Sequence, residues 1–290
     1  MKQQEYYIYD DGVRIHLKQD FPQDMPKAAD EDTAGQIHVN EKDGKKPGSE
    51  TADAVSGSVR DRKYPLLIVI HGFTGNMEEE HLLSVVKTAN ETGFIVLRAE
   101  MYGHGESGGA FHDHTLFKWI SNAMAVIDYA RSLDYVSDLY LCGHSQGGLI
   151  TMLVGAMEQD RLKAILPLSP AWMIPEIARK GKLLGIQFDP DDLPEKLDID
   201  KGLTLGNNYI RTAQMIDVLP AIRRFKKPVL LVHGGSDLSV PVHYSEKAAD
   251  LYADARLVII PEDTHCYDLH KDQLAEAVRS FLEEMIQRTC

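Results

Sequence analysis

The chain is poor in cysteine and has no long apolar run, and each shortage excludes a class of protein. Its three cysteines, Cys142, Cys266 and Cys290, are odd in number and lack a C-x-x-C spacing, which excludes a disulfide framework and a cysteine zinc site. No stretch reaches the roughly 18 apolar residues of a membrane span, and the first residues lack the apolar core of a signal peptide. We therefore expect a cytoplasmic protein with no membrane partner.

Basic residues are also in deficit. The 290 residues include 31 Lys and Arg against 44 Asp and Glu, which gives a net charge of −13. This surplus of acid repels phosphate backbones, so nucleic acid is excluded as a partner. Hydrophobic residues make up 43% and charged residues 26%, as in ordinary globular proteins and unlike disordered or fibrous ones. The length suits a single domain over residues 1–290.

Apolar strands and helices alternate along most of the chain. The β-prone runs 6–9 and 13–18, joined through Asp10-Asp11-Gly12, predict an N-terminal antiparallel hairpin. Helical stretches then separate further apolar runs, at 65–70, 94–97, 138–142, 164–168, 228–232 and 257–260. Near-continuous apolar strands of this kind form parallel sheets. The predicted fold class is therefore α/β, with a mostly parallel sheet and helices on both faces.

Two segments depart from this alternation. Residues 23–62 have no aromatic residue and many Asp, Lys, Gly and Ser, which predicts a polar insertion, either a solvated loop or a flap at the active site. Residues 169–224 contain several Pro and Gly and short helical stretches. We interpret this second segment as a cap, inserted in the same domain, over the ends of the strands.

The strongest chemical signal is Gly143-His144-Ser145-Gln146-Gly147, which follows an apolar strand and precedes a helix. In this context the G-x-S-x-G pattern forms a sharp strand-to-helix turn that exposes the serine hydroxyl at the sheet edge. Ser145 is therefore the predicted nucleophile.

A serine nucleophile needs a base, and the base needs an acid that orients it. Asp237 and His265 follow the strands at 228–233 and 257–260, where parallel sheets bind ligands. The chain order Ser, Asp, His is that of the G-x-S-x-G hydrolases. Asp263 and Asp268 compete for contact with His265, but Asp237 has the better position at a strand end.

Ester chemistry also develops an oxyanion, which requires preorganised donors. The turn His71-Gly72-Phe73-Thr74-Gly75 follows the first parallel strand, and we assign the backbone N–H groups of Phe73 and Gln146 as donors. A plain glycine-rich turn is the alternative for this segment. His112-Asp113-His114 lacks a third ligand at a fitting spacing, so we expect neither a metal nor a cofactor.

Together these motifs, with Gly103-His104-Gly105-Glu106-Ser107, resemble the α/β-hydrolase superfamily over about residues 65–287. The elbow around Ser145 and the stretch 203–211 are similar to bacterial cinnamoyl or feruloyl esterases. The resemblance implies hydrolysis of hydroxycinnamate esters, a cap that grips the phenolic ring with Tyr209 near it, and a homodimer. Glu100 departs from the family pattern, because an Asp commonly stands there, and the 23–62 insertion is longer than expected.

We therefore predict a serine esterase that forms an acyl-enzyme with a small-molecule ester. In the cap, Trp172 and Glu176 are further candidates for substrate binding, with packing or surface positions as the alternative. A monoacylglycerol-lipase-like or aminopeptidase-like hydrolase has the same triad and remains open, since the cap sequence does not distinguish them. A non-catalytic binding protein on this fold is the remote alternative.

Overall fold

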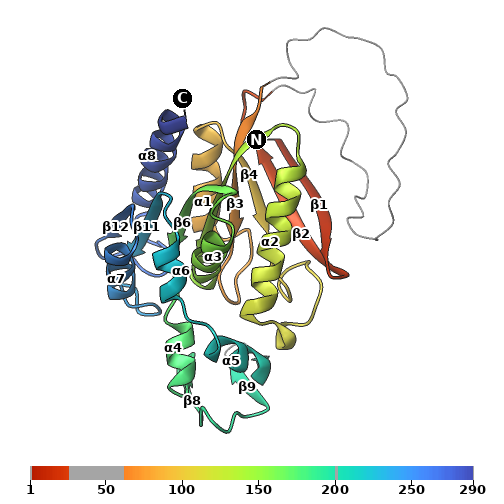
Figure 1. Cartoon of the computed structure of the whole chain (residues 1–290), viewed down its shortest axis with the longest axis vertical. Coiled ribbons are helices and arrows are strands. Elements are labelled where there is room, and N and C mark those ends of the chain that lie inside the picture. Colours follow the sequence, from red (N-terminus) through yellow and green to blue (C-terminus); the bar gives the residue numbers. More distant parts are fainter. Residues whose placement is uncertain (1, 26–61, 200–201, 290) are drawn as a thin grey trace.

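The structure is a computed structural model that describes residues 2–25, 62–199 and 202–289. Most of the predicted insertion at 23–62 lies outside the described residues. Within the described part, eight strands form one sheet in the order β1-β2-β4-β3-β5-β6-β11-β12 (Figure 1). In chain order these are β1 (Lys2–Asp10), β2 (Val13–Phe21), β3 (Tyr64–Ile70), β4 (Ile95–Ala99), β5 (Val136–His144), β6 (Leu162–Leu168), β11 (Val229–Gly234) and β12 (Ala255–Ile260).

The predicted fold class is confirmed. β1 and β2 form an antiparallel hairpin, and β2 pairs antiparallel with β4. All the other neighbours in the sheet, from β4 to β12, run parallel. The hairpin turn has Asp11 and Gly12 at positive φ, 47° and 76°, as a two-residue Asp-Gly connection requires.

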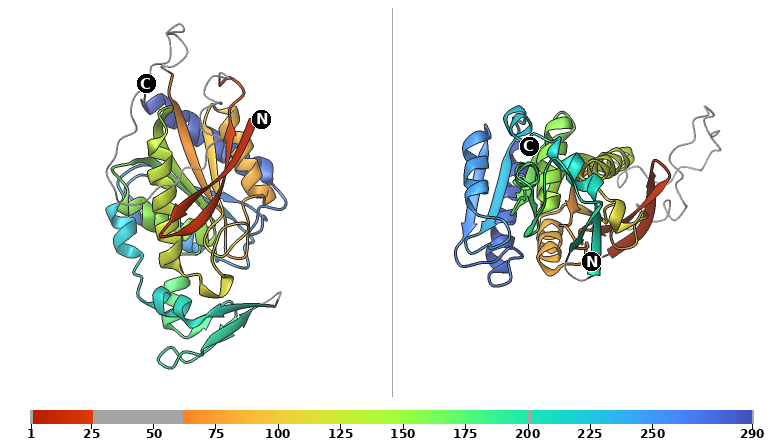
Figure 2. Two further views of the ribbon diagram at one scale, coloured as in Figure 1. Left: turned by 90° about the vertical axis from the view of Figure 1, so that its right-hand side faces the viewer. Right: turned by 90° about the horizontal axis from the view of Figure 1, so that it is seen from below.

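Helices cover both faces of the sheet, because alternate residues of its apolar strands point to opposite sides (Figure 2). One face packs against α1 (Glu80–Glu91) and α8 (Lys271–Thr289). The other face packs against α2 (Leu116–Ser132), α3 (Gln146–Met157), α6 (Leu219–Arg224) and α7 (His243–Leu251). On β3, for example, Leu66 and Ile68 belong to one core and Leu67 and Val69 to the other.

The segment predicted as the cap leaves the sheet after β6 and returns at β11. It projects below the sheet in Figure 1. It forms α4 (Ile174–Arg179), β7 (Lys182–Leu183), β8 (Ile186–Gln187), β9 (Lys196–Ile199), β10 (Leu203–Gly206) and α5 (Asn207–Gln214) before α6. Strands β7 and β8 pair with each other, as do β9 and β10, and neither pair joins the main sheet. A short 3-10 helix, η2 (Phe111–Asp113), precedes α2.

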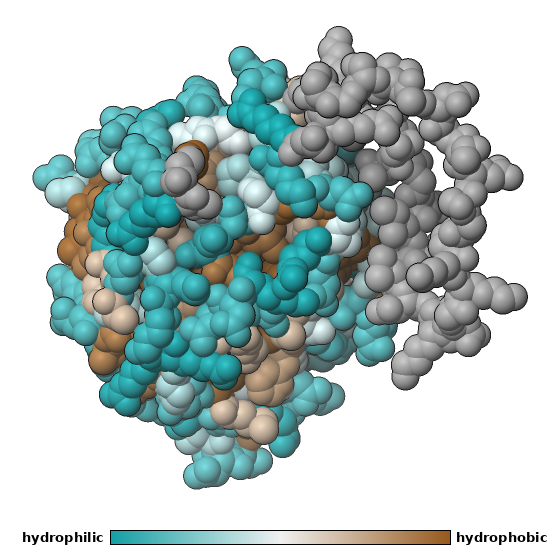
Figure 3. All heavy atoms as spheres, turned by 45° about the horizontal axis from the view of Figure 1, so that its top comes forward, coloured by the Kyte–Doolittle hydropathy of each residue, from teal (hydrophilic) through white to brown (hydrophobic). Residues whose placement is uncertain are grey.

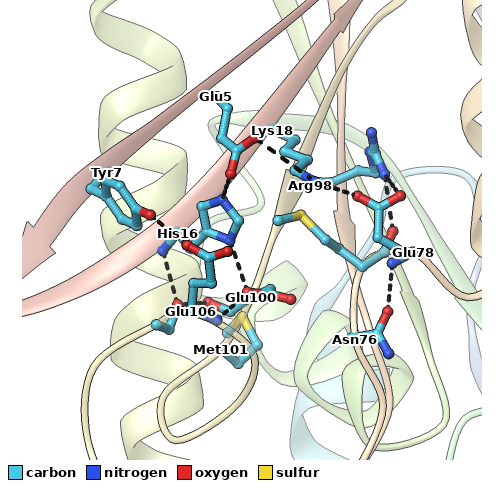
Figure 4. Close-up of polar contacts among 12 residues, drawn as sticks. Glu5, Tyr7, His16, Lys18, Asn76, Glu78, Arg98, Glu100, Met101 and Glu106 are labelled. Atoms are coloured by element: carbon cyan, nitrogen blue, oxygen red, sulfur yellow. Dashed lines mark hydrogen bonds and ion pairs between the residues drawn. The ribbon is translucent and has the colours of Figure 1, made fainter.

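Polar contacts fasten the N-terminal hairpin to the rest of the sheet (Figure 4). His16 of β2 lies between two carboxylates, with Nδ1 2.8 Å from Glu100 Oε2 and Nε2 2.7 Å from Glu5 Oε1. Glu100 Oε2 also accepts the backbone N–H of Glu106 at 2.6 Å. Glu100, an unusual residue at its position in the family pattern, therefore joins the turn after β4 to the hairpin.

The surface agrees with the acidic composition. The face drawn in Figure 3 is mainly hydrophilic, and polar side chains interrupt its hydrophobic areas. In the described part of the chain, no helix combines the length and apolar composition that crossing a bilayer would require.

Candidate active site

Ser145 occupies the turn between β5 and α3. Its backbone has φ 56° and ψ −116°, a strained conformation for a residue other than glycine. Two hydrogen bonds of 2.9 Å hold this conformation, one from the Ser145 N–H to Leu168 O and one from the Ala171 N–H to Ser145 O. Within 141–150, Ser145 is the only residue that is not buried. The turn therefore presents one side chain from an otherwise buried segment.

The glycines around Ser145 are required by close packing. A Cβ atom on Gly143 would lie 2.3 Å from Gly147 O, and one on Gly147 would lie 2.4 Å from His71 O. A Cβ atom on Gly72 would lie 3.2 Å from the Cβ of Ser145. The turn after β3 therefore packs directly against Ser145, as an oxyanion-binding segment must.

Asp237 and His265 lie together, each in the loop that follows a strand. The Nδ1 atom of His265 is 2.6 Å from Oδ2 of Asp237, whose side chain is fully buried. Oδ1 of Asp237 accepts the N–H groups of Ser239 and Val240, both at 2.8 Å. Because an ionised carboxylate only accepts, His265 carries its proton on Nδ1 and leaves Nε2 with a free lone pair.

A further histidine supports Asp237, and the sequence analysis missed it. His233 Nε2 lies 3.1 Å from Asp237 Oδ2 and 2.9 Å from Val240 O, while its Nδ1 is 2.7 Å from Ser245 Oγ. Burial acts to raise the pKa of Asp237, but the hydrogen bonds from His233 and His265 hold that pKa well below its ordinary value. No local pattern distinguishes His233 from the other histidines of the sequence.

The two competing acids have other partners. The carboxylate of Asp263 accepts the N–H groups of Thr264 at 2.8 Å, Leu269 at 3.1 Å and His270 at 3.0 Å. Asp268 accepts the hydroxyl of Thr264 at 2.5 Å. Both acids therefore shape the loop that carries His265, whereas Asp237 contacts the imidazole itself.

The loop of His265 is joined to the serine turn through His144. The Nε2–H of His144 donates to the carbonyl oxygen of His265 at 2.8 Å, and the two ring centroids are 4.6 Å apart. His265 therefore lies against the residue that precedes Ser145. Among the described residues the Ser145 hydroxyl makes no hydrogen bond. Hydrogen bonds between a catalytic base and its partner commonly tighten only once substrate binds.

Two neutral histidines hold the turn after β3. His71 donates from Nδ1 to Gly72 O at 2.7 Å and accepts the Met101 N–H at Nε2, at 3.0 Å. Burial lowers the pKa of His71 to about 3, so this tautomer is stable at neutral pH. His104 Nε2 accepts the Thr74 N–H at 3.2 Å.

Two backbone N–H groups near Ser145 lack an acceptor among the described residues. Within the described ranges the Phe73 N–H meets no acceptor. Gln146, the first residue of α3, has no acceptor for its N–H inside the helix. These are the two donors predicted from the sequence.

A cleft of about 410 Å³ lies between the turn after β3 and the cap. Three of its four described cap residues are apolar, and its described lining residues are Phe73, Thr74, Leu184, Ile186, Asp198, Ile199 and Ser239. The lining joins the predicted oxyanion turn to the loop of Asp237, so the cleft adjoins both parts of the candidate site.

The cap residues predicted to bind substrate do not line this cleft. Tyr209 is only 2% exposed, although its ring centroid lies 6.1 Å from that of Phe73. Trp172 is buried and donates its indole N–H to Tyr244 O at 2.9 Å. Glu176 forms an ion pair with Lys180. Their substrate contacts stay predictions.

Comparisons with known proteins agree with this architecture. A family model described as serine aminopeptidase, S33, matches residues 62–188. Est1E from Butyrivibrio proteoclasticus, solved with ferulic acid bound, is 46% identical with a TM-score of 0.84, and the match covers 97% of this chain and 99% of that one. Human mitochondrial palmitoyl-protein thioesterase ABHD10 is 22% identical over 212 residues, 70% of this chain and 67% of that protein.

A monoacylglycerol lipase from Paleococcus ferrophilus has the same fold, with a TM-score of 0.60 and 17% identity over 77% of this chain and 97% of that one. The fold and these matches are those of a hydrolase. The 46% identity to Est1E extends over nearly the whole of both chains. The chain therefore belongs to the α/β-hydrolase superfamily, and its predicted similarity to the cinnamoyl esterases is confirmed.

Proposed function

We propose that this hydrolase is a serine carboxylic-ester hydrolase in which Ser145 is the nucleophile, His265 the base and Asp237 the residue that orients the base. The observation that carries the proposal is the 2.6 Å contact of His265 Nδ1 with Asp237 Oδ2, in a loop bonded to the residue before Ser145. An imidazole held in this tautomer presents Nε2 as the proton acceptor that a serine requires.

In the proposed reaction, Ser145 Oγ attacks the ester carbonyl carbon while its proton passes to His265 Nε2. The carbonyl oxygen becomes an oxyanion and accepts the N–H groups of Phe73 and Gln146. The C–O bond to the alcohol breaks, and the alcohol leaves with the proton from His265. Water, deprotonated by His265, then attacks the acyl-enzyme, and the carboxylic acid is released with Ser145 restored. These steps use no cofactor.

We further propose hydroxycinnamate esters as the substrates. Support comes from the extensive identity to Est1E, whose structure holds ferulic acid. The cleft beside Phe73 adds support, because Leu184, Ile186 and Ile199 offer apolar surface to a planar aromatic acyl group. Asp198, the only acid among the described lining residues, has its Oδ1 3.3 Å from Lys196 Nζ and so is already paired.

The test compares kcat/KM for methyl ferulate with that for a short-chain aliphatic ester, a monoacylglycerol and an aminoacyl anilide. Ser145→Ala serves as the inactive variant, and Ser132→Ala, at an exposed serine near the end of α2, is the matched control. We expect a preference for methyl ferulate, with kcat lower by a factor on the order of 10⁴ to 10⁶ in Ser145→Ala and unchanged in Ser132→Ala.

Each other outcome has a distinct meaning. Preference for the monoacylglycerol or the aliphatic ester would retain the triad and overturn the hydroxycinnamate assignment. Turnover of the anilide alone would favour an aminopeptidase, the activity that the description of the matching family model names. Full ester turnover by Ser145→Ala would overturn the triad itself, and an inactive wild-type chain would favour the binding-protein alternative.

A further inference from the structure

Two histidine nitrogens next to the candidate active site are buried without a hydrogen bond. Nε2 of His81 and Nδ1 of His144 have no partner within the described part of the chain, although the two residues are only 3% and 2% exposed. A buried polar atom without a hydrogen-bond partner lowers the stability of the folded state. Two such atoms in neighbouring rings, with centroids 4.2 Å apart, therefore need an explanation.

The chemical state of His144 follows from its other nitrogen. Its Nε2 bonds to the carbonyl oxygen of His265, which can only accept, so Nε2 carries a proton. Burial lowers the pKa of His144 well below its ordinary value, so the ring is neutral and Nδ1 presents a bare lone pair. Burial also lowers the pKa of His81 to about 4. Both rings are therefore neutral imidazoles, the form that binds metals.

A carboxylate completes the group. Glu79, at the N-terminal end of α1, is half-buried, and a carboxylate oxygen of Glu79, a ring nitrogen of His81 and one of His144 all lie within 4.8 Å of one another. The carboxylate and the His144 lone pair are both acceptors. A neutral His81 ring adds one lone pair to them, so three atoms that can ligate a cation lie near one another.

We propose that Glu79, His81 and His144 bind a divalent transition-metal ion, with Zn²⁺ as the ion that best fits the donor set. Two imidazoles and one carboxylate form a ligand set of intermediate softness, which is typical of Zn²⁺. Three protein ligands leave one coordination position for water. Zinc bonds of about 2.0–2.2 Å place two ligand atoms at most about 4.4 Å apart. A side-chain shift on the order of 1 Å therefore closes the site.

The ion would strengthen the structure around His265. His144 would bind it through Nδ1 while donating from Nε2 to the His265 carbonyl, so the carbonyl takes the outer-shell position that orients a metal-bound histidine. The ion would thus link the N-terminus of α1, the end of β5 and the loop of His265. This role is structural and does not depend on which ester is hydrolysed.

A second group of ligating side chains offers a useful contrast. Glu5, His16 and Glu106 each offer a ligand atom within 4.8 Å of the others, and Figure 4 shows these three side chains together. Both ring nitrogens of His16 are already bonded to carboxylates, and Glu5 and Glu106 are exposed. The Glu5 group is therefore a satisfied hydrogen-bond network and carries no metal proposal.

The test measures Zn²⁺ binding by the untagged full-length chain after treatment with a chelator and dialysis. Calorimetric titration gives stoichiometry and Kd, and Co²⁺ absorption in the visible range reports coordination geometry. The variants are His81→Gln and Glu79→Gln, with His243→Gln at an exposed histidine as the matched control. Circular dichroism checks that each variant is folded, and ester turnover is recorded separately.

We expect one Zn²⁺ per chain in the wild type and in His243→Gln, a rise in thermal midpoint on binding, and a Kd at least about tenfold higher in both ligand variants. Absence of a saturable site, or equal affinity in Glu79→Gln and wild type, would overturn the proposal. Should His81→Gln not fold, Glu79→Gln and the Co²⁺ spectrum of the wild type decide it. Because the readout is metal binding, a negative result leaves the proposed ester hydrolysis untouched.

Discussion

The hydroxyl of Tyr209 in α5 donates a 2.6 Å hydrogen bond to Oε1 of Gln146, the residue that follows Ser145. Both side chains are buried, and burial raises the pKa of Tyr209, so the phenol stays a donor. The cap is thereby bonded to the first turn of α3, whose leading N–H group is a proposed oxyanion donor. Tyr209, which the resemblance places near the substrate ring, thus contacts a residue of the candidate catalytic turn.

Tyr209→Phe is expected to destabilise the protein by about 1–3 kcal/mol, because Gln146 Oε1 would be left buried without a partner. Equilibrium unfolding in urea measures this difference. Tyr244→Phe is the matched control, since Tyr244 is only half-buried, and its free energy of unfolding should change little. Equal stabilities of wild type and Tyr209→Phe would show that the hydrogen bond contributes nothing.

Asp237→Asn is expected to lower kcat by about 10⁴-fold, because the amide no longer holds His265 in the tautomer with a free Nε2. Ester turnover measured over a range of substrate concentrations separates this loss from any change in KM. The exposed neighbour Asp268 gives the control, and Asp268→Asn should retain most of the turnover. A nearly active Asp237→Asn would remove Asp237 from the proposed triad.

Stability is expected to fall as the pH decreases below about 6.5, the unperturbed pKa of histidine. Burial lowers the pKa of both His71 and His114 to about 3. Between these values the unfolded chain binds more protons than the folded one. Each of these two histidines therefore lowers the free energy of unfolding by up to about 1.4 kcal/mol for each pH unit of decrease.

Asp237 stabilises the folded state because its pKa there is depressed. This contribution to the free energy of unfolding is lost only at lower pH, as the pH falls below about 4. Urea unfolding at pH 7.5, 6.5, 5.5 and 4.5 measures how the free energy of unfolding changes with pH. A free energy of unfolding that stays constant from pH 7.5 to 4.5 would contradict the neutral state of the two histidines.

Gly147→Ala is expected to destabilise the protein by about 1–3 kcal/mol or more, since the added methyl group would overlap the carbonyl of His71. Gly155→Ala in the same helix is the control. There the nearest atoms belong to the side chain of Ile165, at 3.1 Å, which can shift. Thermal unfolding should therefore show a much larger decrease for Gly147→Ala, and similar decreases for the two variants would argue against the close contact.

Much of the fold could be predicted because its signals are local. The apolar run predicted at 138–142 lies inside β5, which extends over Val136–His144, and the helix predicted to follow the Ser145 motif is α3, Gln146–Met157. Likewise Ser145 could be assigned as an elbow residue from its neighbours alone. Spacing along one segment determines these features, and the spacing is visible in the sequence.

Other parts of the site could not be predicted because they join distant segments. Asp237 was preferred over Asp263 and Asp268 for its place at a strand end, but the other contacts of these acids depend on how the loops pack. The role of His233 beneath Asp237 was equally hidden, because one histidine among 12 has no distinguishing local pattern.

The sequence by itself therefore determined the α/β class, the order of strands and helices, and the strained turn at Ser145, since each depends on backbone preference and on apolar periodicity over a few residues. Tertiary structure alone decided that His233 supports Asp237, which cap residue contacts Gln146, and that His81 and His144 lie ring to ring. Those relationships depend on side chains brought together from separate strands and loops, and on the removal of water between them.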